Sequence, residues 1–444
     1  MGLWMPDIDF PAIADRANSD GEFKIASRLW KAILEIQVDD DVRRLLIDNG
    51  RIEALDAGTA APADATVVAL RGSADAWVKH LDPSPRPGWV GITQSGHIVY
   101  HGEPSVRAAY HGAVRLIVEF MREQLHGPLT ERPTAKVTRS SDEIRGRYLY
   151  LDVEGTQYRV YYEESGNPDG IPLVMQHTAG SDGRQWRHVL NDPDYQRDFR
   201  LLAYDLPYHG KSSPPTGIKW WQQDYMPTKS WLFEFLTNFM AEVRAERSVF
   251  IGCSIGGLMA PVLAHELPEM FRAVIGVNAG VLRFPEGEPP AAEDVPLSHL
   301  MDVYFHPRVG NDWKASGVLE LMAPSSPAAT QRETAWLYAS GGPQVFYGDI
   351  LSYSTQFSLS QEQASEIDTS RVAVYLLTGE YDPFAIDGGA NLLASWIDGV
   401  YHEVIPDAGH FAPSDNPDAF KQALDPVLKR IVSASDSAAA PEAR

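Results

Sequence analysis

The spacing of apolar residues predicts two regions of different architecture. Over residues 23–34 and 104–124 apolar residues recur every three or four positions, which is typical of amphipathic helices. Between them, Asn49-Gly50 separates two apolar runs and favours a β-hairpin, because both turn residues need positive φ. A further strand is expected over residues 65–71.

A second helix and hairpin follow in the same region. Ser73 is well placed to cap a helix that continues to Leu81, and Ser95-Gly96 marks another turn. The order of the expected elements predicts a small α+β domain over residues 1–127: helix, hairpin, strand, helix, hairpin and long helix.

After this domain the pattern changes. Residues 128–142 are polar and rich in Pro, Thr and Ser, which predicts a linker. Short apolar runs then predict strands at 147–153, 157–162, 171–175, 199–204, 249–251, 273–277, 372–377 and 400–405. Strands that alternate with helices and end in glycine-bearing loops indicate a mostly parallel sheet, with any chemistry at the C-terminal ends of its strands.

One of these strands runs directly into a Gly-x-Ser-x-Gly sequence. Residues 249–251 are apolar, Gly252 and Gly256 flank Ser254, and apolar residues follow with helical spacing. A serine between a buried strand and a helix requires a very sharp turn, and the two glycines leave room for it. The pattern predicts a nucleophile elbow that exposes the serine hydroxyl.

Five motifs in order resemble those of the α/β-hydrolase superfamily over about residues 145–431. They are His177-x-x-Gly180, Asp205-x-Pro207-x-His209-Gly210-x-Ser212, Gly252-x-Ser254-x-Gly256, Gly379-Glu380-Tyr381-Asp382 and Asp407-Ala408-Gly409-His410-Phe411. The resemblance implies an α/β fold, a mostly parallel sheet flanked by helices with a helical cap insertion. It places the core at 143–278 and 371–434, the cap at 279–370 and a flexible tail at 435–444.

The resemblance also implies a Ser-His-Asp triad. Ser254 would be the nucleophile and His410, after the last strand, the base that takes its proton. Asp382 would orient the histidine and stabilise its cation. His402 and His209 are rival bases, but His402 falls inside the last predicted strand and His209 lies on a loop that more naturally braces the site.

The assignments of the triad carboxylate and of the oxyanion donors leave alternatives open. Glu380 and Asp387 could replace Asp382, which could instead simply cap a helix. By the resemblance, the backbone N–H groups of Ala179 and Ile255 would form the oxyanion hole.

The chain departs from the family at two loops. Thr178 stands where the family usually has glycine, and its hydroxyl could donate a third hydrogen bond to an oxyanion or cap the loop. The family's usual Pro-Gly-x-Gly turn is Pro207-Tyr208-His209-Gly210 here, which a loop should tolerate.

The N-terminal domain resembles the sterol carrier protein type 2 family. The resemblance depends on the order of its elements and on Trp77-Val78-Lys79-His80-Leu81 before a strand pair. It implies a sheet covered by helices that enclose an apolar tunnel. The alternative is a stabilising or dimerising domain with a filled core, so a homodimer is possible.

Composition limits the kinds of partner and the compartment that we expect for this protein. A formal net charge of −22 argues against nucleic acid and anionic membranes, because both favour clustered Lys and Arg. The single cysteine, Cys253, excludes an internal disulfide and fits a reducing compartment. The N-terminus has no signal-peptide pattern and no apolar run is long enough to span a bilayer, so we expect a cytoplasmic protein. No spacing of metal ligands or cofactor-binding glycines is present.

These expectations converge on a serine hydrolase that cleaves a carboxylic ester or lactone through an acyl-enzyme. Aromatic and methionine residues are dense in the expected cap, which favours an apolar substrate. The same triad could also serve a carbon–carbon bond hydrolase acting on a vinylogous diketone, or a perhydrolase. A lipid-binding or scaffolding protein with a dormant hydrolase fold is the alternative from another class.

Overall fold

The computed structural model describes residues 8–56, 59, 62–92, 96–128, 142–281, 309–342, 345–382 and 389–439. The chain forms two compact units. The first comprises Met1–Arg132 with Pro296–Ser325, and the second comprises Pro133–Val295 with Ser326–Arg444. The predicted linker lies almost wholly outside the described residues, as do Ser95 of the second predicted turn and the end of the predicted tail.

The first unit contains a five-stranded mixed sheet in the order β3-β2-β1-β4-β5. Its strands are β1 (Lys31–Val38), β2 (Asp41–Asp48), β3 (Arg51–Leu55), β4 (Thr66–Gly72) and β5 (Ile98–His101). β1 runs parallel to β4, and the other neighbours are antiparallel. The hairpin predicted at Asn49-Gly50 is confirmed, since both residues have positive φ and join β2 to β3.

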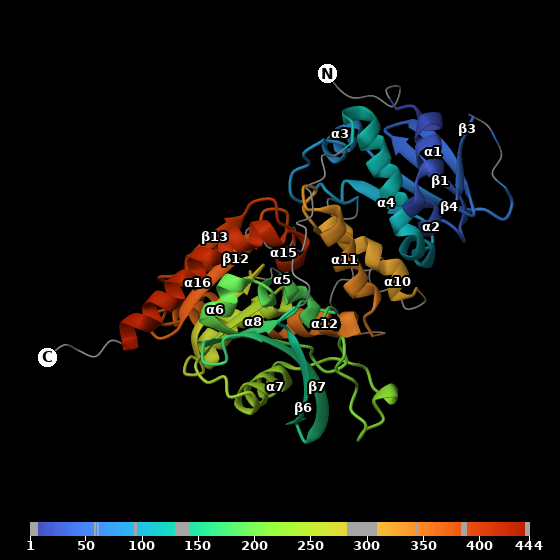
Figure 1. Cartoon of the computed structure of the whole chain (residues 1–444). Coiled ribbons are helices and arrows are strands. Elements are labelled where there is room, and N and C mark those ends of the chain that lie inside the picture. The colour runs from blue at the N-terminus through green and yellow to red at the C-terminus, as the bar shows by residue number, and fades with distance from the viewer. Residues whose placement is uncertain are drawn as a thin grey trace. The chain divides into compact units, whose positions relative to one another are not determined.

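Helices α1 (Phe10–Ser19), α2 (Gly21–Ala26), α3 (Ala74–His80) and α4 (Pro104–His126) complete this part of the chain. α1 and α4 lie side by side in Figure 1 and share a core with the sheet. The predicted N-cap of α3, Ser73, accepts a hydrogen bond from Ala76 N–H. Before residue 20, where the sequence analysis predicted no element, the chain forms α1, which buries Phe10, Ile13, Ala14 and Ala17.

The helix predicted over residues 23–34 is wrong. The chain leaves helical conformation after Ala26, and residues 31–38 form β1, the central strand of the sheet. Ala32, Ile33 and Leu34 are all buried there. A short apolar run suits a buried strand as well as a helix face, and pairing with two neighbouring strands decided between them.

Part of the segment expected to form the cap belongs to the first unit. α10 (Asn311–Lys314) and η5 (Ala315–Leu321) pack against α4. Tyr110 and Trp313 meet edge to face, with ring centroids 5.4 Å apart. A Cβ at Gly112 would lie 2.8 Å from the Ser316 hydroxyl, so the glycine permits this close approach.

The second unit has an eight-stranded sheet in the order β13-β12-β11-β10-β8-β9-β7-β6. The strands are β6 (Arg145–Val153), β7 (Thr156–Gly166), β8 (Ile171–Gln176), β9 (Phe199–Tyr204), β10 (Ser248–Cys253), β11 (Phe271–Val277), β12 (Ala373–Gly379) and β13 (Tyr401–Ile405). The strands from β8 onward pair in parallel, whereas β6 and β7 pair antiparallel. The predicted mostly parallel sheet is confirmed.

Both faces of this sheet are buried because alternate side chains enter different cores. Phe250 belongs to the core that includes residues of α7 and α8, whereas Val249 and Ile251 belong to the core that includes residues of α16. α7 and α16 flank the sheet in Figure 1. The helices of this unit are α5 (Arg187–Leu190), α6 (Pro193–Asp198), α7 (Lys229–Glu242), α8 (Ile255–Glu266), α11 (Ala328–Ala339), α12 (Val345–Gln356), α13 (Gln361–Ser365), α14 (Gly389–Trp396), α15 (Ala412–Asp415) and α16 (Pro417–Ala439), with 3₁₀ turns η2 (Gly183–Trp186) and η3 (Trp220–Gln222).

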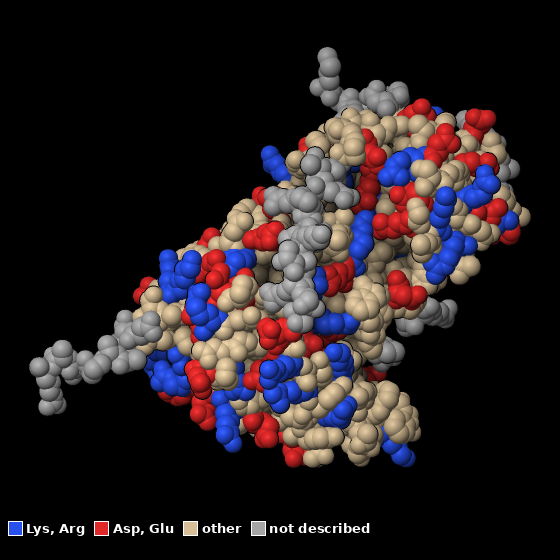
Figure 2. All heavy atoms as spheres, viewed as in Figure 1, with Lys and Arg blue, Asp and Glu red and all other residues tan. Residues whose placement is uncertain are grey.

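Acidic and basic side chains are interspersed on the face of the molecule seen in Figure 2. The excess of acidic residues therefore does not gather into one patch on that face. Among the described helices, none is both long and apolar enough to cross a membrane.

Candidate active site

The turn after β10 has the geometry of a nucleophile elbow. Ser254 has φ of 57° and ψ of −110°, a conformation that is rare for a residue with a side chain. A Cβ at Gly252 would lie 2.4 Å from the backbone of Gly256, and a Cβ at Gly256 would lie 2.6 Å from Gln176 Cγ. Only glycine fits at these two positions, so the local sequence makes the sharp turn possible.

The three side chains predicted as a triad lie in one hydrogen-bonded line. Ser254 Oγ is 2.9 Å from His410 Nε2, and His410 Nδ1 is 2.9 Å from Asp382 Oδ1. All three residues are buried; Ser254 follows β10, Asp382 follows β12 and His410 follows β13. Because a carboxylate only accepts, His410 Nδ1 carries the proton, which leaves Nε2 to accept the serine O–H.

Asn278, which the sequence analysis did not single out, connects the segments that carry Asp382 and His410. It follows β11, and its Nδ2 donates to the carbonyls of Gly409 and His410 at 3.1 and 2.8 Å. Its Oδ1 accepts the N–H of Gly379, the last residue of β12, at 2.7 Å. One side chain therefore fixes the two loops relative to each other.

The backbone amides of Ala179 and Ile255, close to Ser254 in the fold, have no hydrogen-bond acceptor among the described residues. Ile255 is the first residue of α8, where N–H groups have no intrahelical acceptor and the helix dipole is positive. The amides on either side of Ala179 are bonded. Thr178 N–H donates to Gln185 Oε1 at 2.9 Å, and Gly180 N–H donates to Asp349 Oδ2 at 2.7 Å.

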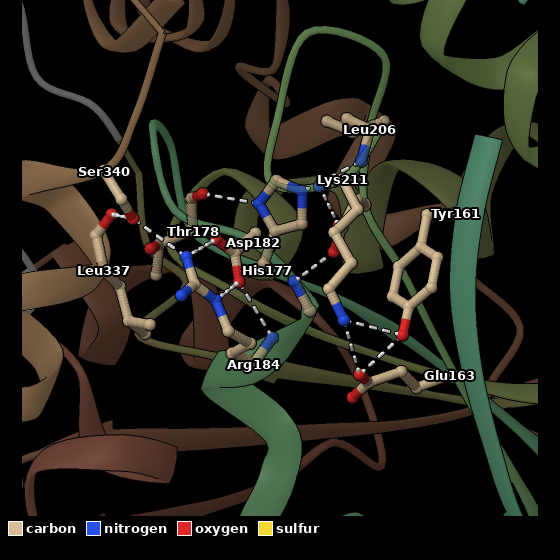
Figure 3. A network of polar contacts seen from close by, with 12 residues as sticks. Tyr161, Glu163, His177, Thr178, Asp182, Arg184, Leu206, Lys211, Leu337 and Ser340 are labelled. Atoms are coloured by element: carbon tan, nitrogen blue, oxygen red, sulfur yellow. Dashed lines mark hydrogen bonds and ion pairs between the residues drawn. The ribbon is translucent and has the colours of Figure 1, made fainter. Parts of the chain in front are cut away.

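His177 anchors the start of this loop in a neutral form. Figure 3 shows its ring between the Thr178 carbonyl, 2.8 Å from Nδ1, and Leu206, whose N–H donates to Nε2 at 3.1 Å. An acceptor on one side and a donor on the other identify the Nδ1–H tautomer. Burial, together with the smaller effect of the nearby His209, lowers the pKa of His177 to about 4, so the ring stays uncharged at neutral pH.

The Thr178 hydroxyl lies 2.6 Å from the Tyr338 hydroxyl on α11. The sequence left two roles open for this hydroxyl, donation to an oxyanion or stabilisation of the loop, and this contact favours stabilisation of the loop. The ring of Tyr338 also contacts Phe346 and Phe411, with centroids 5.4 and 5.3 Å away, and Phe411 contacts the His410 ring at 5.0 Å. A row of packed aromatic rings therefore leads away from His410.

The rival residues lie elsewhere. His402 is in β13, where Nε2 is 3.2 Å from the Thr378 hydroxyl. His209 Nε2 lies 2.8 Å from Asp349 Oδ2, and Glu380 Oε2 accepts the N–H of Asp407. Asp387 is outside the described residues.

Cys253 is a packed residue of the elbow. Its side chain is fully buried, and its thiol donates to the His410 carbonyl at 3.3 Å. Burial raises the pKa of the Cys253 thiol well above its usual value, which disfavours the reactive thiolate. No group of three or more His, Cys, Asp or Glu side chains suited to a metal ion occurs within the described ranges.

The fold and this geometry define the class of protein. Residues 173–423, more than half of the chain, match the model of the Alpha/beta hydrolase family. The protein therefore belongs to that family.

Several known proteins are similar to the chain. The 3-oxoadipate enol-lactonase 2 of Acinetobacter baylyi is 23% identical over 283 residues, which cover 61% of this chain and 93% of that protein. Epoxide hydrolase 4 of Mus musculus is 22% identical over 299 residues, covering 63% and 78%. The structure of a hydrolase from Pseudomonas aeruginosa PA01 has a TM-score of 0.52 at 20% identity and covers 63% of this chain and 98% of that one. At these identities the structural likeness concerns the fold.

Proposed function

We propose that this protein is a serine hydrolase that cleaves a carboxylic ester or lactone of an apolar substrate through an acyl-enzyme. The observation that carries the proposal is the line of hydrogen bonds from Asp382 through His410 to Ser254, beside two amides without acceptors. A serine hydroxyl needs an adjacent base to become a nucleophile, and a tetrahedral oxyanion needs two oriented donors.

The steps follow from this arrangement. Ser254 Oγ attacks the carbonyl carbon while His410 Nε2 takes its proton, and the amides of Ala179 and Ile255 stabilise the oxyanion. The tetrahedral intermediate collapses as His410 protonates the leaving alcohol, which leaves the acyl group on Ser254. Water then attacks the acyl-enzyme, with His410 again as the base, and releases the acid. Asp382 holds the imidazole in orientation throughout.

The substrate class is argued from the surroundings of His410. The rings of Phe411, Tyr338 and Phe346 contact one another in sequence. Apolar side chains packed beside His410 favour an apolar acyl or alcohol group. A lactone is the cyclic form of the same bond, and the enol-lactonase among the similar proteins supports including it. An epoxide substrate is disfavoured, because opening an epoxide through a covalent intermediate requires a carboxylate where Ser254 stands.

The role of the first unit is a separate proposal. Its five-stranded sheet with helices α1 and α4 over one face is compatible with the sterol carrier resemblance, and we propose that it binds an apolar ligand or stabilises the enzyme.

The proposed activity is tested with a fluorophosphonate probe and p-nitrophenyl esters of graded chain length. The probe is expected to label Ser254, and Ser254→Ala should abolish labelling and lower turnover by about 10³-fold or more. Ser395→Ala, an exposed serine on α14, is the control and should retain both. Near-normal turnover in Ser254→Ala would end the serine-hydrolase hypothesis.

A further inference from the structure

A fully buried carboxylate lies beside the loop that carries Ala179. Asp349, on α12, accepts hydrogen bonds from Gly180 N–H at 2.7 Å and from His209 Nε2 at 2.8 Å through Oδ2, and from the Tyr225 hydroxyl at 3.1 Å through Oδ1. Burying a carboxylate is costly unless it is paired and hydrogen-bonded. The three donors come from three separate segments, so Asp349 joins them to α12.

His209 neutralises this carboxylate. Its Nδ1 faces the Pro207 carbonyl at 3.0 Å, and its Nε2 faces Asp349, so both ring nitrogens meet groups that only accept. Such surroundings require a proton on each nitrogen. Burial by itself would lower the pKa of His209, but Asp349 and its hydrogen bond outweigh burial and raise the pKa. Asp349 and His209 therefore form a buried ion pair.

Glycines allow α12 to approach the backbone on both sides of Asp349. Gly180 has φ of +66°, and a Cβ there would lie 2.6 Å from Phe346 Cβ on α12. A Cβ at Gly348 would lie 1.8 Å from the Tyr225 carbonyl oxygen. The helix thus packs on backbone rather than on mobile side-chain ends, which holds the Gly180 amide closely in place.

The amide of Ala179 is placed by its two neighbours. Gln185 accepts the Thr178 N–H and Asp349 accepts the Gly180 N–H. The N–H of Ala179, which lies between these two residues, has no acceptor in the described part of the chain. We infer that Asp349 is a positioning residue for the oxyanion donor of Ala179, which it holds through Gly180 while His209 balances its charge. This inference rests on the proposed function, and it assigns the inserted segment between β11 and β12 a part in transition-state stabilisation.

The inference predicts a selective loss in Asp349→Ala. An oxyanion donor displaced by a fraction of its contact distance stabilises the tetrahedral state less, while the ground-state ester hardly depends on it. We expect kcat to fall about 10- to 100-fold with KM changed less than about threefold. The affinity for a trifluoromethyl ketone, which forms a tetrahedral adduct with a serine, should fall by a similar factor. The affinity for the product carboxylate should remain unchanged.

Two further variants separate positioning from folding. Asp349→Asn retains an oxygen that can accept the Gly180 N–H but loses the charge, and it should recover most of the lost kcat. Glu366→Gln is the matched control, because Glu366 pairs with His265 at 3.0 Å on the exposed surface of the same unit and should leave kcat unchanged. Thermal unfolding of each variant shows whether it is folded.

The outcomes are distinguishable. Folded Asp349→Ala with normal kcat and normal affinity for the ketone overturns the inference. So does an equal loss of affinity for ketone and product, which is what a general structural role would produce. Should Asp349→Ala not fold, Asp349→Ser, whose shorter side chain cannot keep all three hydrogen bonds, is measured in its place and judged by the same criterion. If instead Ser254→Ala retains turnover, it is the proposed function that fails.

Discussion

The elbow at Ser254 and the loop over residues 176–180 each carry one of the two proposed oxyanion donors, yet they are held in different ways. The elbow depends chiefly on neighbours in sequence, since Gly252 and Gly256 pack backbone against backbone. The loop depends on side chains from other segments. Tyr338 and Asp349 are 160 and 169 residues away from the residues they bind.

This difference has a physical reason. A turn that forces one residue to positive φ can be built from steric rules alone, so a short motif suffices. An N–H that must stay without an acceptor cannot be held by its own hydrogen bond. The loop has to be fixed through the amides beside it, and their acceptors can come from anywhere in the fold.

The largest effect is expected from breaking the elbow with Gly252→Ala. The added methyl group would lie 2.4 Å from the backbone of Gly256, which cannot move without displacing α8. We expect ester turnover to fall about 10²-fold or more and the free energy of unfolding to fall by at least about 1–3 kcal/mol. Gly217→Ala is the control, since a Cβ there has no atom within 4 Å and its φ is not positive. Kinetics and urea unfolding measure both effects, and a Gly252→Ala enzyme like wild type would contradict the elbow.

Acid should affect the loop through His177. Its pKa of about 4 in the folded state lies below the ordinary value of 6.5, because burial disfavours the charged ring. The contribution of the neutral His177 ring to the free energy of unfolding is therefore complete above about pH 6.5. It is lost as the pH falls toward 4, for a total of about 3 kcal/mol. Urea unfolding between pH 7 and pH 4.5 should show a shallower loss in His177→Gln than in wild type.

His188 provides the comparison for this experiment. Burial also lowers the pKa of His188 to about 4, but this residue lies on α5 and outside the loop. His188→Gln should reduce the pH dependence of stability while leaving ester turnover unchanged. If His177→Gln retained the full pH dependence of wild type, the neutral state assigned to His177 would be wrong.

The smallest effect is expected at the Thr178–Tyr338 contact. Thr178→Val or Tyr338→Phe removes one partner of a buried 2.6 Å hydrogen bond. Each should cost about 1 kcal/mol of stability and lower kcat only a few-fold. The double variant should lose little more than either single variant, because the contact is already absent. A loss of about 10²-fold or more in kcat for Thr178→Val alone would indicate that the hydroxyl reaches the oxyanion instead.

Sequence and tertiary structure determined different parts of this protein. The resemblance to the superfamily's motifs implied the positions of Ser254, Asp382 and His410 at strand ends. The mostly parallel sheet and the elbow could be predicted from the residues themselves, because strand alternation and glycine-bearing turns are local properties. The same reasoning failed over residues 23–34, where the apolar run suited both helix and strand and β-pairing decided.

Only the tertiary structure brought Asn278, Gln185 and Asp349 to the site. Each is a polar residue with no motif around it, and its hydrogen-bond partners become neighbours only when distant segments pack together. Asp349 in particular lies in the segment between β11 and β12, which carries no repeating pattern that could predict its contacts. A short sequence motif determines the local backbone around a nucleophile, whereas the orientation of the groups around it depends on long-range packing, because each buried polar atom must find its partner in the completed fold.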